Sequence, residues 1–295
     1  MTLLLLGKNG QVGWELQRAL SPLGAVTACG RDADLLDLAG LRTLIREVKP
    51  AAIVNAAAYT AVDRAESEPD LAQRINCDAP AVLAEEAARL GAWLVHYSTD
   101  YVFDGTKTGA YTETDVTAPV NVYGRTKRDG EEAIMASGCR HLIFRTSWVH
   151  GAHGGNFIKT MLRLAAERSA LRVVADQIGA PTGAELIADV TAHALRRAMG
   201  RDDGQLSGLY HLTAAGETNW RDFAALVLAE AQKLGASLKT APEAVEPIGT
   251  SDYPTPAKRP ANSRLDTQKL RKAFGIYLPP WQAPVQRVVA ELIKQ

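Results

Sequence analysis

Short apolar runs alternate with helical patterns along the first half of the chain. Five runs are largely apolar over their whole length: 3–6, 25–28, 52–54, 92–97 and 141–146. The segments between them repeat apolar residues with helical spacing: 12–20, 38–48, 71–90 and 123–135. Continuous apolar strands that alternate with helices are typical of a parallel sheet covered on both faces. With right-handed crossovers, this pattern predicts an α/β fold with a Rossmann-type, doubly wound parallel sheet.

The second half of the chain is less regular. Helical patterns occupy 157–168, 184–199, 219–234 and 281–294, and short strands are expected at 171–174 and 208–212. The Pro-rich segment 241–260 is expected to be an ordered loop or lid. We therefore expect residues 1–147 to form one lobe and residues 148–295 to form mainly a smaller, interleaved lobe. Segments near 171–180 and 208–240 are predicted to return to the first lobe.

Composition narrows the classes of protein that need consideration. The 295 residues contain 33 Lys and Arg against 33 Asp and Glu, which argues against a nucleic-acid-binding surface. Cys29, Cys77 and Cys139 are far apart and form no CxxC pair, so neither a disulfide framework nor a zinc site is expected. No apolar stretch approaches the ~20 residues of a membrane span. We expect a cytoplasmic protein that does not bind membranes.

A glycine-rich turn follows the first predicted strand directly. Gly7, Gly10 and Gly13 form a GxxGxxG pattern that also contains Gln11 and Val12, and it opens the first predicted helix. Glycines allow a tight turn and a close approach of a pyrophosphate to backbone N–H groups at a helix N-terminus. The position predicts dinucleotide binding, and the alternative is a turn that only packs the helix on the sheet.

The end of the second predicted strand bears on the choice of dinucleotide. An acidic residue there holds a ribose 2′-hydroxyl, whereas arginine accommodates a 2′-phosphate. Gly30 is followed by Arg31 and an aspartate, so both NADPH and NADH remain open, and Arg31 favours NADPH. Asp37 and Leu38 are candidates to cover the adenine. Alternatively, the arginine and aspartate after Gly30 are only a solvated charge pair.

Tyr123 and Lys127 form a YxxxK pattern that places both side chains on one face of a predicted helix. A nearby ammonium lowers a tyrosine pKa from its reference of about 10, which suits proton exchange with a carbonyl oxygen. Thr99 and Asp100 follow the fourth predicted strand, at the edge of a parallel sheet where ligands bind. The Thr99 hydroxyl can therefore reach the same substrate oxygen as the tyrosine.

The glycine turn, the strand-end Thr99 and the YxxxK pattern together resemble the extended short-chain dehydrogenase/reductase family. Further segments extend the resemblance over essentially the whole chain, toward reductases of 4-keto nucleotide sugars: VNAAAYT at 54–60, FRTSWV at 144–149, DQIGAPT at 176–182 and PAKRPANS at 256–263. This resemblance implies NAD(P)H-dependent reduction of the C4 keto group of dTDP-4-dehydro-L-rhamnose to dTDP-L-rhamnose. It also implies that the smaller lobe binds the nucleotide sugar.

The resemblance implies a role for each matching residue. Tyr123 would protonate the C4 oxygen, Lys127 would hold the nicotinamide ribose, and Thr99 would hydrogen-bond the reacting oxygen. Further cofactor contacts would come from Ala58, Tyr59, Thr60 and Tyr97. Further substrate contacts would come from Asp100, Trp148, Asn156 and Arg259.

Other interpretations remain open. One is a nucleotide-sugar 4-epimerase of the same family, and another is a non-catalytic, NADP-binding regulatory subunit. Some family members also hold a divalent cation between two subunits, which would implicate Glu15, Glu185 and Glu291 as Mg²⁺ ligands in a homodimer. The alternative is that all three are ordinary exposed helix glutamates, which are common and bind no metal.

Overall fold

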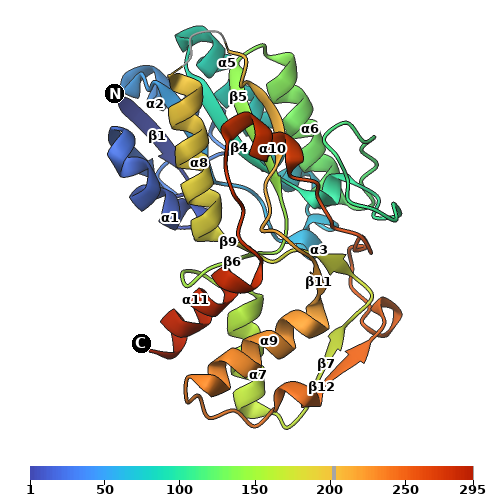
Figure 1. Cartoon of the computed structure of the whole chain (residues 1–295). Helices are drawn as coiled ribbons and strands as arrows, with labels where there is room; N and C mark the ends of the chain where they lie inside the picture. Colours follow the sequence, from blue (N-terminus) through green and yellow to red (C-terminus); the bar gives the residue numbers. More distant parts are fainter. Residues whose placement is uncertain (201–203, 295) are drawn as a thin grey trace.

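The computed structural model describes residues 1–200 and 204–294 and divides into two lobes (Figure 1). The larger lobe is built on six parallel strands in the order β10-β5-β4-β3-β1-β2. Their bounds are β1 (Thr2–Leu6), β2 (Ala25–Cys29), β3 (Ala52–Asn55), β4 (Trp93–Thr99), β5 (Arg140–Thr146) and β10 (Gly208–His211). Because the order reverses beside β1, the doubly wound parallel sheet is confirmed.

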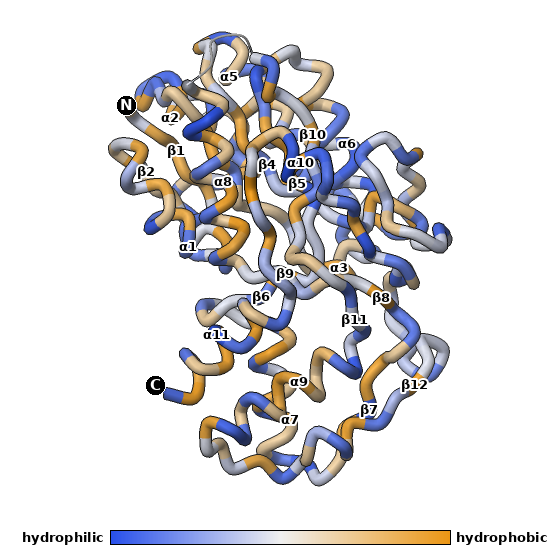
Figure 2. The backbone as a smooth tube through the Cα atoms, in the orientation of Figure 1, coloured by the Kyte–Doolittle hydropathy of each residue, from blue (hydrophilic) through white to orange (hydrophobic). Residues whose placement is uncertain are grey.

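Helices cover both faces of this sheet, which explains why its strands are apolar throughout. Leu3 and Leu5 share one buried cluster with helices of one face, and Leu4 and Leu6 share a second cluster with helices of the other. The first face carries α1 (Gln11–Leu20), α8 (Ala184–Met199) and α10 (Gln268–Phe274). The second face carries α2 (Leu38–Val48), α5 (Ala79–Leu90) and α6 (Val122–Ala136). The hydrophobic colouring along β1 in Figure 2 follows from this double covering.

The smaller lobe packs three helices around a core centred on Phe223 and Trp281. They are α7 (Phe157–Glu167), α9 (Trp220–Lys233) and α11 (Gln282–Ile293). Three pairs of short strands accompany them: β6 (Val149–His150) with β9 (Thr182–Gly183), β7 (Leu171–Val174) with β12 (Val245–Ile248), and β8 (Ile178–Gly179) with β11 (Thr218–Asn219). The strand β12 falls inside the segment expected to be a loop, where Pro247 masks the strand pattern.

The chain crosses between the lobes differently from the prediction. Residues 171–180 do not return to the large sheet, because β7 pairs with β12 and β8 pairs with β11. Of the segment 208–240, β10 joins the large sheet beside β5, whereas α9 packs on α7 and α11. Helices α8 and α10 lie on the large lobe (Figure 1). Helical periodicity shows which face is buried but not which core buries it, so this partition could not be predicted.

The helix expected over 71–90 is interrupted. The structure has α4 (Pro69–Gln73), a π-helical turn η2 (Arg74–Asp78) and then α5, with Pro80 in its first turn. The turn brings the Asn76 carbonyl against α6, where a Cβ at Gly130 would lie 2.1 Å from that oxygen. The remaining short elements are η1 (Ser21–Leu23), α3 (Val62–Ala65), η3 (Asp100–Val102), η4 (Pro242–Ala244) and η5 (Thr250–Asp252).

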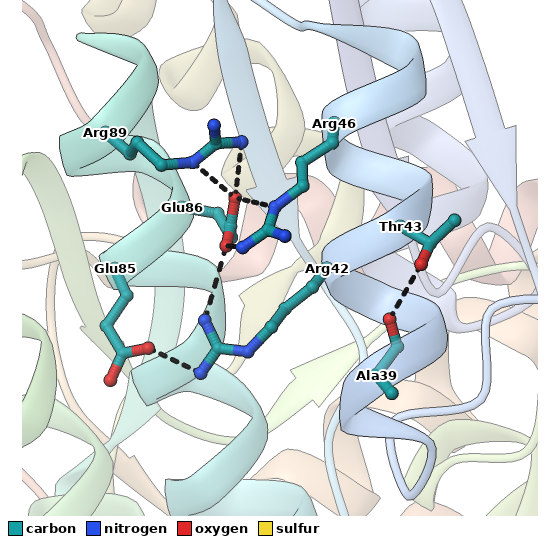
Figure 3. A network of polar contacts seen from close by, with 7 residues as sticks. All are labelled: Ala39, Arg42, Thr43, Arg46, Glu85, Glu86 and Arg89. Atoms are coloured by element: carbon teal, nitrogen blue, oxygen red, sulfur yellow. Dashed lines mark hydrogen bonds and ion pairs between the residues drawn. The ribbon is translucent and has the colours of Figure 1, made fainter.

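Glu86 of α5 joins this helix to α2. Its buried carboxylate accepts hydrogen bonds from Arg46 at 2.6 and 3.0 Å, from Arg42 at 3.3 Å and from Arg89 at 2.9 Å (Figure 3). These arginines, led by Arg46, lower the pKa of Glu86 to about 2. The charged form is therefore favoured in the folded chain, and the cluster stabilises the packing of α2 on α5.

We expect Glu86→Gln to lower the free energy of unfolding by about 1–3 kcal/mol, because it removes charge-assisted hydrogen bonds from a buried site. The matched control is Glu85→Gln, whose exposed carboxylate meets only Arg42 and should change stability by less than about 1 kcal/mol. Urea unfolding measures both. Because the folded pKa is lowered, the Glu86 contribution should be present above about pH 4.5 and lost as pH falls toward 2. Equal effects of the two variants at pH 7 would contradict this role.

Candidate active site

The glycine turn is shaped to receive an anion. Gly7 has φ of +83° and its amide donates to the Cys29 carbonyl at 3.0 Å, which closes the turn after β1. A Cβ at Gly13 would lie 2.0 Å from the Gly7 carbonyl oxygen, so only glycine allows α1 to start this close. Gly10, the N-cap of α1, supplies no side-chain cap. The first amides of the helix, including those of Gln11 and Val12, are therefore available to a phosphate.

The residues after β2 lie beside this turn. A Cβ at Gly30 would meet the side chain of Asn9 at 2.7 Å, and the Gly30 amide donates to Asp32 at 2.6 Å. Arg31 is exposed and has no hydrogen-bond partner within 1–200 and 204–294. Asp37 is the N-cap of α2 and accepts from the Gly40 amide, with Leu38 half-buried behind it. Arg31 is thus free to meet a ligand, whereas the Asp37 carboxylate is engaged by its helix.

Tyr123, Thr99 and Asp100 meet at the carboxyl end of β4. The N-cap Asn121 starts α6 by accepting from the Gly124 amide at 2.7 Å, which fixes the helical turn that carries Tyr123. The Thr99 hydroxyl lies close enough to Tyr123 to influence the phenol, and it donates to Asp100 Oδ1 at 3.0 Å. Asp100 Oδ2 is buried without a hydrogen-bond partner among the described residues. The site therefore offers an unused acceptor beside a phenol and a hydroxyl.

The electrostatics of Tyr123 differ from the prediction. Burial, reinforced by the charge of Asp100, raises the pKa of Tyr123 instead of lowering it. Among the described residues, no hydrogen bond joins Lys127 to the Tyr123 phenol. The Lys127 Nζ lies 3.0 Å from His96 Nε2 instead. Burial lowers the pKa of Lys127 to about 8 and raises that of Asp100 to about 6. These surroundings keep Tyr123 protonated, as a proton donor requires.

The predicted cofactor-lining residues after β3 are held in place by α6. Asn76 accepts from the Tyr59 amide at 2.9 Å, and its amide nitrogen donates to the Tyr59 carbonyl and to Thr126. This anchors the segment that contains Ala58 and Thr60 against the helix bearing Tyr123. Tyr97 of β4 turns its hydroxyl to Thr191 of α8, 2.8 Å away.

A cavity of about 670 Å³ opens between the two lobes. Tyr101 forms part of its wall and meets the Tyr123 ring edge-on, with ring centroids 5.8 Å apart. Polar and aromatic side chains of the wall are Asp63, Phe157, Thr160, Arg168, Arg172, Gln177, Trp220, Tyr253 and Arg259. Arginines and aromatic rings in one cleft are suited to a phosphorylated ligand that carries a planar base.

Arg259 joins the Pro-rich segment to the large lobe across this cavity. Its guanidinium bonds to Asp63 at 2.7 Å, lies over the Tyr101 ring and donates to the Tyr101 hydroxyl at 3.4 Å. The Ala257 amide also donates to Asp63, at 3.2 Å. The predicted substrate residue therefore lies in the cavity, with one carboxylate as its present partner.

Trp148 lies beside the cavity, whereas Asn156 lies at the glycine turn. Trp148, with φ of +49°, stacks on Trp220 at 3.7 Å between centroids, beside the cavity. Asn156 caps α7 and donates to Gln11 Oε1 at 3.1 Å, so it contacts the glycine turn. Neither Tyr101 nor Trp220 was among the predicted site residues, although both line the cavity. The signal that could have revealed Tyr101 was its position four residues after the apolar run 92–97, at the edge of the sheet where ligands bind.

The three candidate metal ligands approach one another but are engaged by arginines. Arg287 lies 3.2 Å from Glu185 and 3.1 Å from Glu291, and Arg18 lies 3.4 Å from Glu15. Burial raises the pKa of Glu185 to about 6. Within the described residues of one chain, no cluster of acidic, His or Cys side chains forms a metal site. The site shared between two copies stays a prediction.

Comparison with known proteins identifies the family. The RmlD substrate binding domain model matches residues 1–294. The chain belongs to this family. The RmlD family relatives include the dTDP-4-dehydrorhamnose reductase of Escherichia coli K12, which is 53% identical over 99% of this chain and 98% of its own length. The enzyme of the same name from Burkholderia thailandensis is 50% identical over the full length of both chains.

A solved RmlD-type structure has the same fold. The crystal structure of dTDP-4-dehydrorhamnose reductase from Bacillus anthracis in complex with NADP superposes with a TM-score of 0.89 and is 33% identical, covering 98% of this chain and 99% of its own. The likeness spans both lobes, so the smaller lobe belongs to the shared architecture.

No helix in the described part of the chain is long and apolar enough to cross a membrane.

Proposed function

We propose that the protein reduces the C4 keto group of dTDP-4-dehydro-L-rhamnose to give dTDP-L-rhamnose, with NADPH or NADH as the reductant. The observation that carries this proposal is the cluster of Tyr123, Thr99 and Asp100, joined through the Tyr123–Tyr101 ring contact to an arginine-lined cavity. Reductases that share half of its residues over their full lengths support the choice of substrate.

The glycine turn would hold the dinucleotide pyrophosphate through the amides of Gln11 and Val12 at the α1 N-terminus. The uncapped helix and the absence of room for a side chain at Gly13 fit this group. The exposed, unpaired Arg31 would meet a 2′-phosphate, which favours NADPH. Tyr59 and its neighbours, fixed by Asn76, would line the nicotinamide half. The bound cofactor supplies the hydride.

The cavity would hold the nucleotide diphosphate portion of the substrate. Arg259 offers a planar fork to phosphate oxygens once it leaves Asp63, and Arg168 and Arg172 add positive charge at the far wall. The stacked pair of Trp148 and Trp220 gives an apolar surface next to the sugar. In this placement the sugar lies between the cavity and Tyr123.

Tyr123 would donate its phenolic proton to the C4 oxygen as that oxygen gains negative charge. The raised pKa keeps the phenol protonated until it is needed, and Thr99 is placed to hydrogen-bond the same oxygen. Asp100 Oδ2, buried and without a partner in the described structure, would accept from a sugar hydroxyl. The balance is one hydride to carbon and one proton to oxygen, which converts the ketone to an alcohol.

The test is a direct assay. The protein is mixed with dTDP-4-dehydro-L-rhamnose and either NADPH or NADH, and the absorbance of the reduced nicotinamide is followed. We expect stoichiometric loss of reduced cofactor, faster with NADPH. An epimerised sugar without cofactor loss would support the 4-epimerase instead, and cofactor binding with no product would support a regulatory subunit.

The same proposal extends to the cellular setting. Phosphorylated nucleotide sugars and reduced nicotinamides are the proposed ligands, and the three cysteines are free thiols. We therefore infer a cytoplasmic enzyme. A homodimer with the glutamates Glu15, Glu185 and Glu291 at its contact is the arrangement to test by light scattering with and without Mg²⁺.

A further inference from the structure

A buried chain of three polar side chains runs behind the proposed active site. Asn55 at the end of β3, His96 in β4 and Lys127 in α6 are each only 1% exposed. Asn55 Nδ2 lies 3.2 Å from His96 Nδ1, and His96 Nε2 lies 3.0 Å from Lys127 Nζ. Among the described residues, His96 is the only hydrogen-bond partner of the Lys127 ammonium position. Because this partner is a histidine rather than a carboxylate, the geometry of the hydrogen bonds bears on whether the Lys127 amine is charged or neutral.

The orientation of the Asn55 amide determines the direction of both hydrogen bonds. Asn55 Oδ1 accepts from the Ala57 amide at 3.1 Å, so the amide nitrogen of Asn55 is the group that faces His96. An amide nitrogen only donates, and His96 Nδ1 must therefore accept. In a neutral imidazole with Nδ1 as acceptor, the proton sits on Nε2. His96 thus presents a donor to Lys127.

An ammonium cannot complete this chain, because it has three donors and no acceptor. A neutral amine can accept from Nε2–H. To accept a hydrogen bond from a charged Lys127, His96 would have to carry its proton on Nδ1, and this N–H would then face the NH₂ group of Asn55. If the Asn55 amide were rotated to avoid that clash, its NH₂ group would face the Ala57 N–H instead. Burial acts in the same direction as this geometry, since it lowers the pKa of both Lys127 and His96.

Nearby charges do not reverse this preference. Glu131, one turn further along α6, favours the charged amine, but it is already paired with Arg145 of β5 through bonds of 2.8 and 2.6 Å. Tyr123, on the same helix, is kept neutral by burial. Asp100 of η3 acts on that phenol and is linked to it through Thr99.

Within residues 1–200 and 204–294, the other elements packed on α6 add no hydrogen-bond partner that competes for Lys127. Cys77 of η2 lies against Gly130, and burial raises its pKa to about 11, so it is an uncharged thiol. Glu66, after α3, accepts from the Val122 amide at the start of α6. On α5, Glu86 faces the arginines of α2 (Figure 3).

We propose that Asn55 and His96 favour the neutral amine of Lys127 in the cofactor-free protein, and that at alkaline pH the binding of a dinucleotide is coupled to the uptake of a proton by Lys127. This inference rests on the proposed function, in which a dinucleotide binds beside Lys127. The ribose hydroxyl oxygens and phosphates supply acceptors and negative charge that favour –NH₃⁺. The step is –NH₂ plus a proton from solvent to give –NH₃⁺. His96 is then a positioning residue that acts through Lys127.

Calorimetric titration of NADPH in two buffers of different ionisation enthalpy measures the protons taken up on binding. With a pKa of about 8 in the free protein and an ordinary value of about 10.4 in the complex, uptake should be about 0.9 proton at pH 9 and about 0.1 at pH 7. Because binding raises the pKa, the affinity for NADPH should fall as pH rises from 8 to 10. Uptake near zero at pH 9 would overturn the inference.

Asn55→Asp tests the direction of the chain without changing its shape. A carboxylate still accepts from the Ala57 amide but also accepts from Nδ1–H of His96, so Nε2 becomes an acceptor for a charged Lys127. Uptake at pH 9 should then fall close to zero while NADPH still binds. If this variant does not fold, His96→Gln, which also offers Lys127 an acceptor, should give the same loss. His141→Gln, at the start of β5, is the matched control and should retain full uptake.

A second measurement separates this inference from the proposed function. In cofactor-free protein with ¹³C-labelled lysine, the Cε resonance that disappears in Lys127→Arg should titrate near pH 8. A midpoint near the ordinary ~10.4 would overturn the inference even if NADPH binds. Failure of both nicotinamide cofactors to bind, with the midpoint still near 8, would instead count against the proposed function alone.

Discussion

Replacing Tyr123 with phenylalanine is expected to lower kcat by about 10²–10⁴-fold, the usual contribution of a positioned general acid. The change removes the proton that the C4 oxygen requires, and Thr99 cannot replace it because an aliphatic hydroxyl is a much weaker acid than a phenol. The ring itself stays packed edge-on against Tyr101. We therefore expect the fold and the affinity for NADPH to remain, and kcat to fall with little change in cofactor binding.

Tyr210→Phe is the matched control for this experiment. Tyr210 is a buried tyrosine, but it lies in β10 at the edge of the sheet and its hydroxyl donates to the Leu206 carbonyl at 3.0 Å. Loss of this hydroxyl should leave kcat within about a factor of two, since it touches no proposed ligand. Near-unchanged turnover of the Tyr123 variant, measured by the loss of reduced nicotinamide, would remove Tyr123 from the acid role.

The second large effect concerns stability. Arg145→Met is expected to lower the free energy of unfolding by about 3–5 kcal/mol, because it leaves the Glu131 carboxylate buried and unpaired. Both side chains are buried, and Arg145 also lies over the Phe103 ring with 5.0 Å to its centroid. Chemical denaturation followed by circular dichroism measures the loss.

The double replacement Arg145→Met with Glu131→Leu is the informative comparison. Removing both charges leaves no isolated ion, so the double variant should recover most of the stability lost by the single one. If the single variant is as stable as the unchanged protein, the pair is not an important contact between α6 and β5. If the double variant is as unstable as the single one, the loss comes from packing rather than from the unpaired charge.

Much of the large lobe could be predicted because local pattern and global fold agree there. The strands from β1 to β5 have largely apolar centres that contribute to both buried clusters, and β1 to β4 are each followed by a helix with an apolar stripe. The GxxGxxG turn has a conformation that only glycine allows, at Gly7 and Gly13. The meeting of Thr99 and Tyr123 followed from the rule that strand ends share one edge of a parallel sheet.

The remaining features depend on contacts that sequence spacing does not encode. His96 lies in a strand that is otherwise apolar, and nothing in its neighbourhood points to Asn55 or Lys127, 41 and 31 residues away. The expected effect of Lys127 on the Tyr123 pKa assumed that a helical spacing of four implies contact. In the structure the lysine turns to β4 instead. The residues of α9 and β12 could have covered either core, and only packing determines which.

The interleaved path of the chain has a mechanical consequence. The glycine turn lies on one lobe and most of the cavity wall lies on the other. The polypeptide passes between the two lobes repeatedly, and the elements on either side of these crossings are β6, α8, β11, α10 and α11 (Figure 1). Two domains joined by a single linker can reorient independently, whereas several connections side by side restrict the domains to a common bending motion. Opening of the cleft should therefore be a hinge movement of small amplitude. For the same reason neither lobe is a contiguous piece of the chain that could be expressed alone.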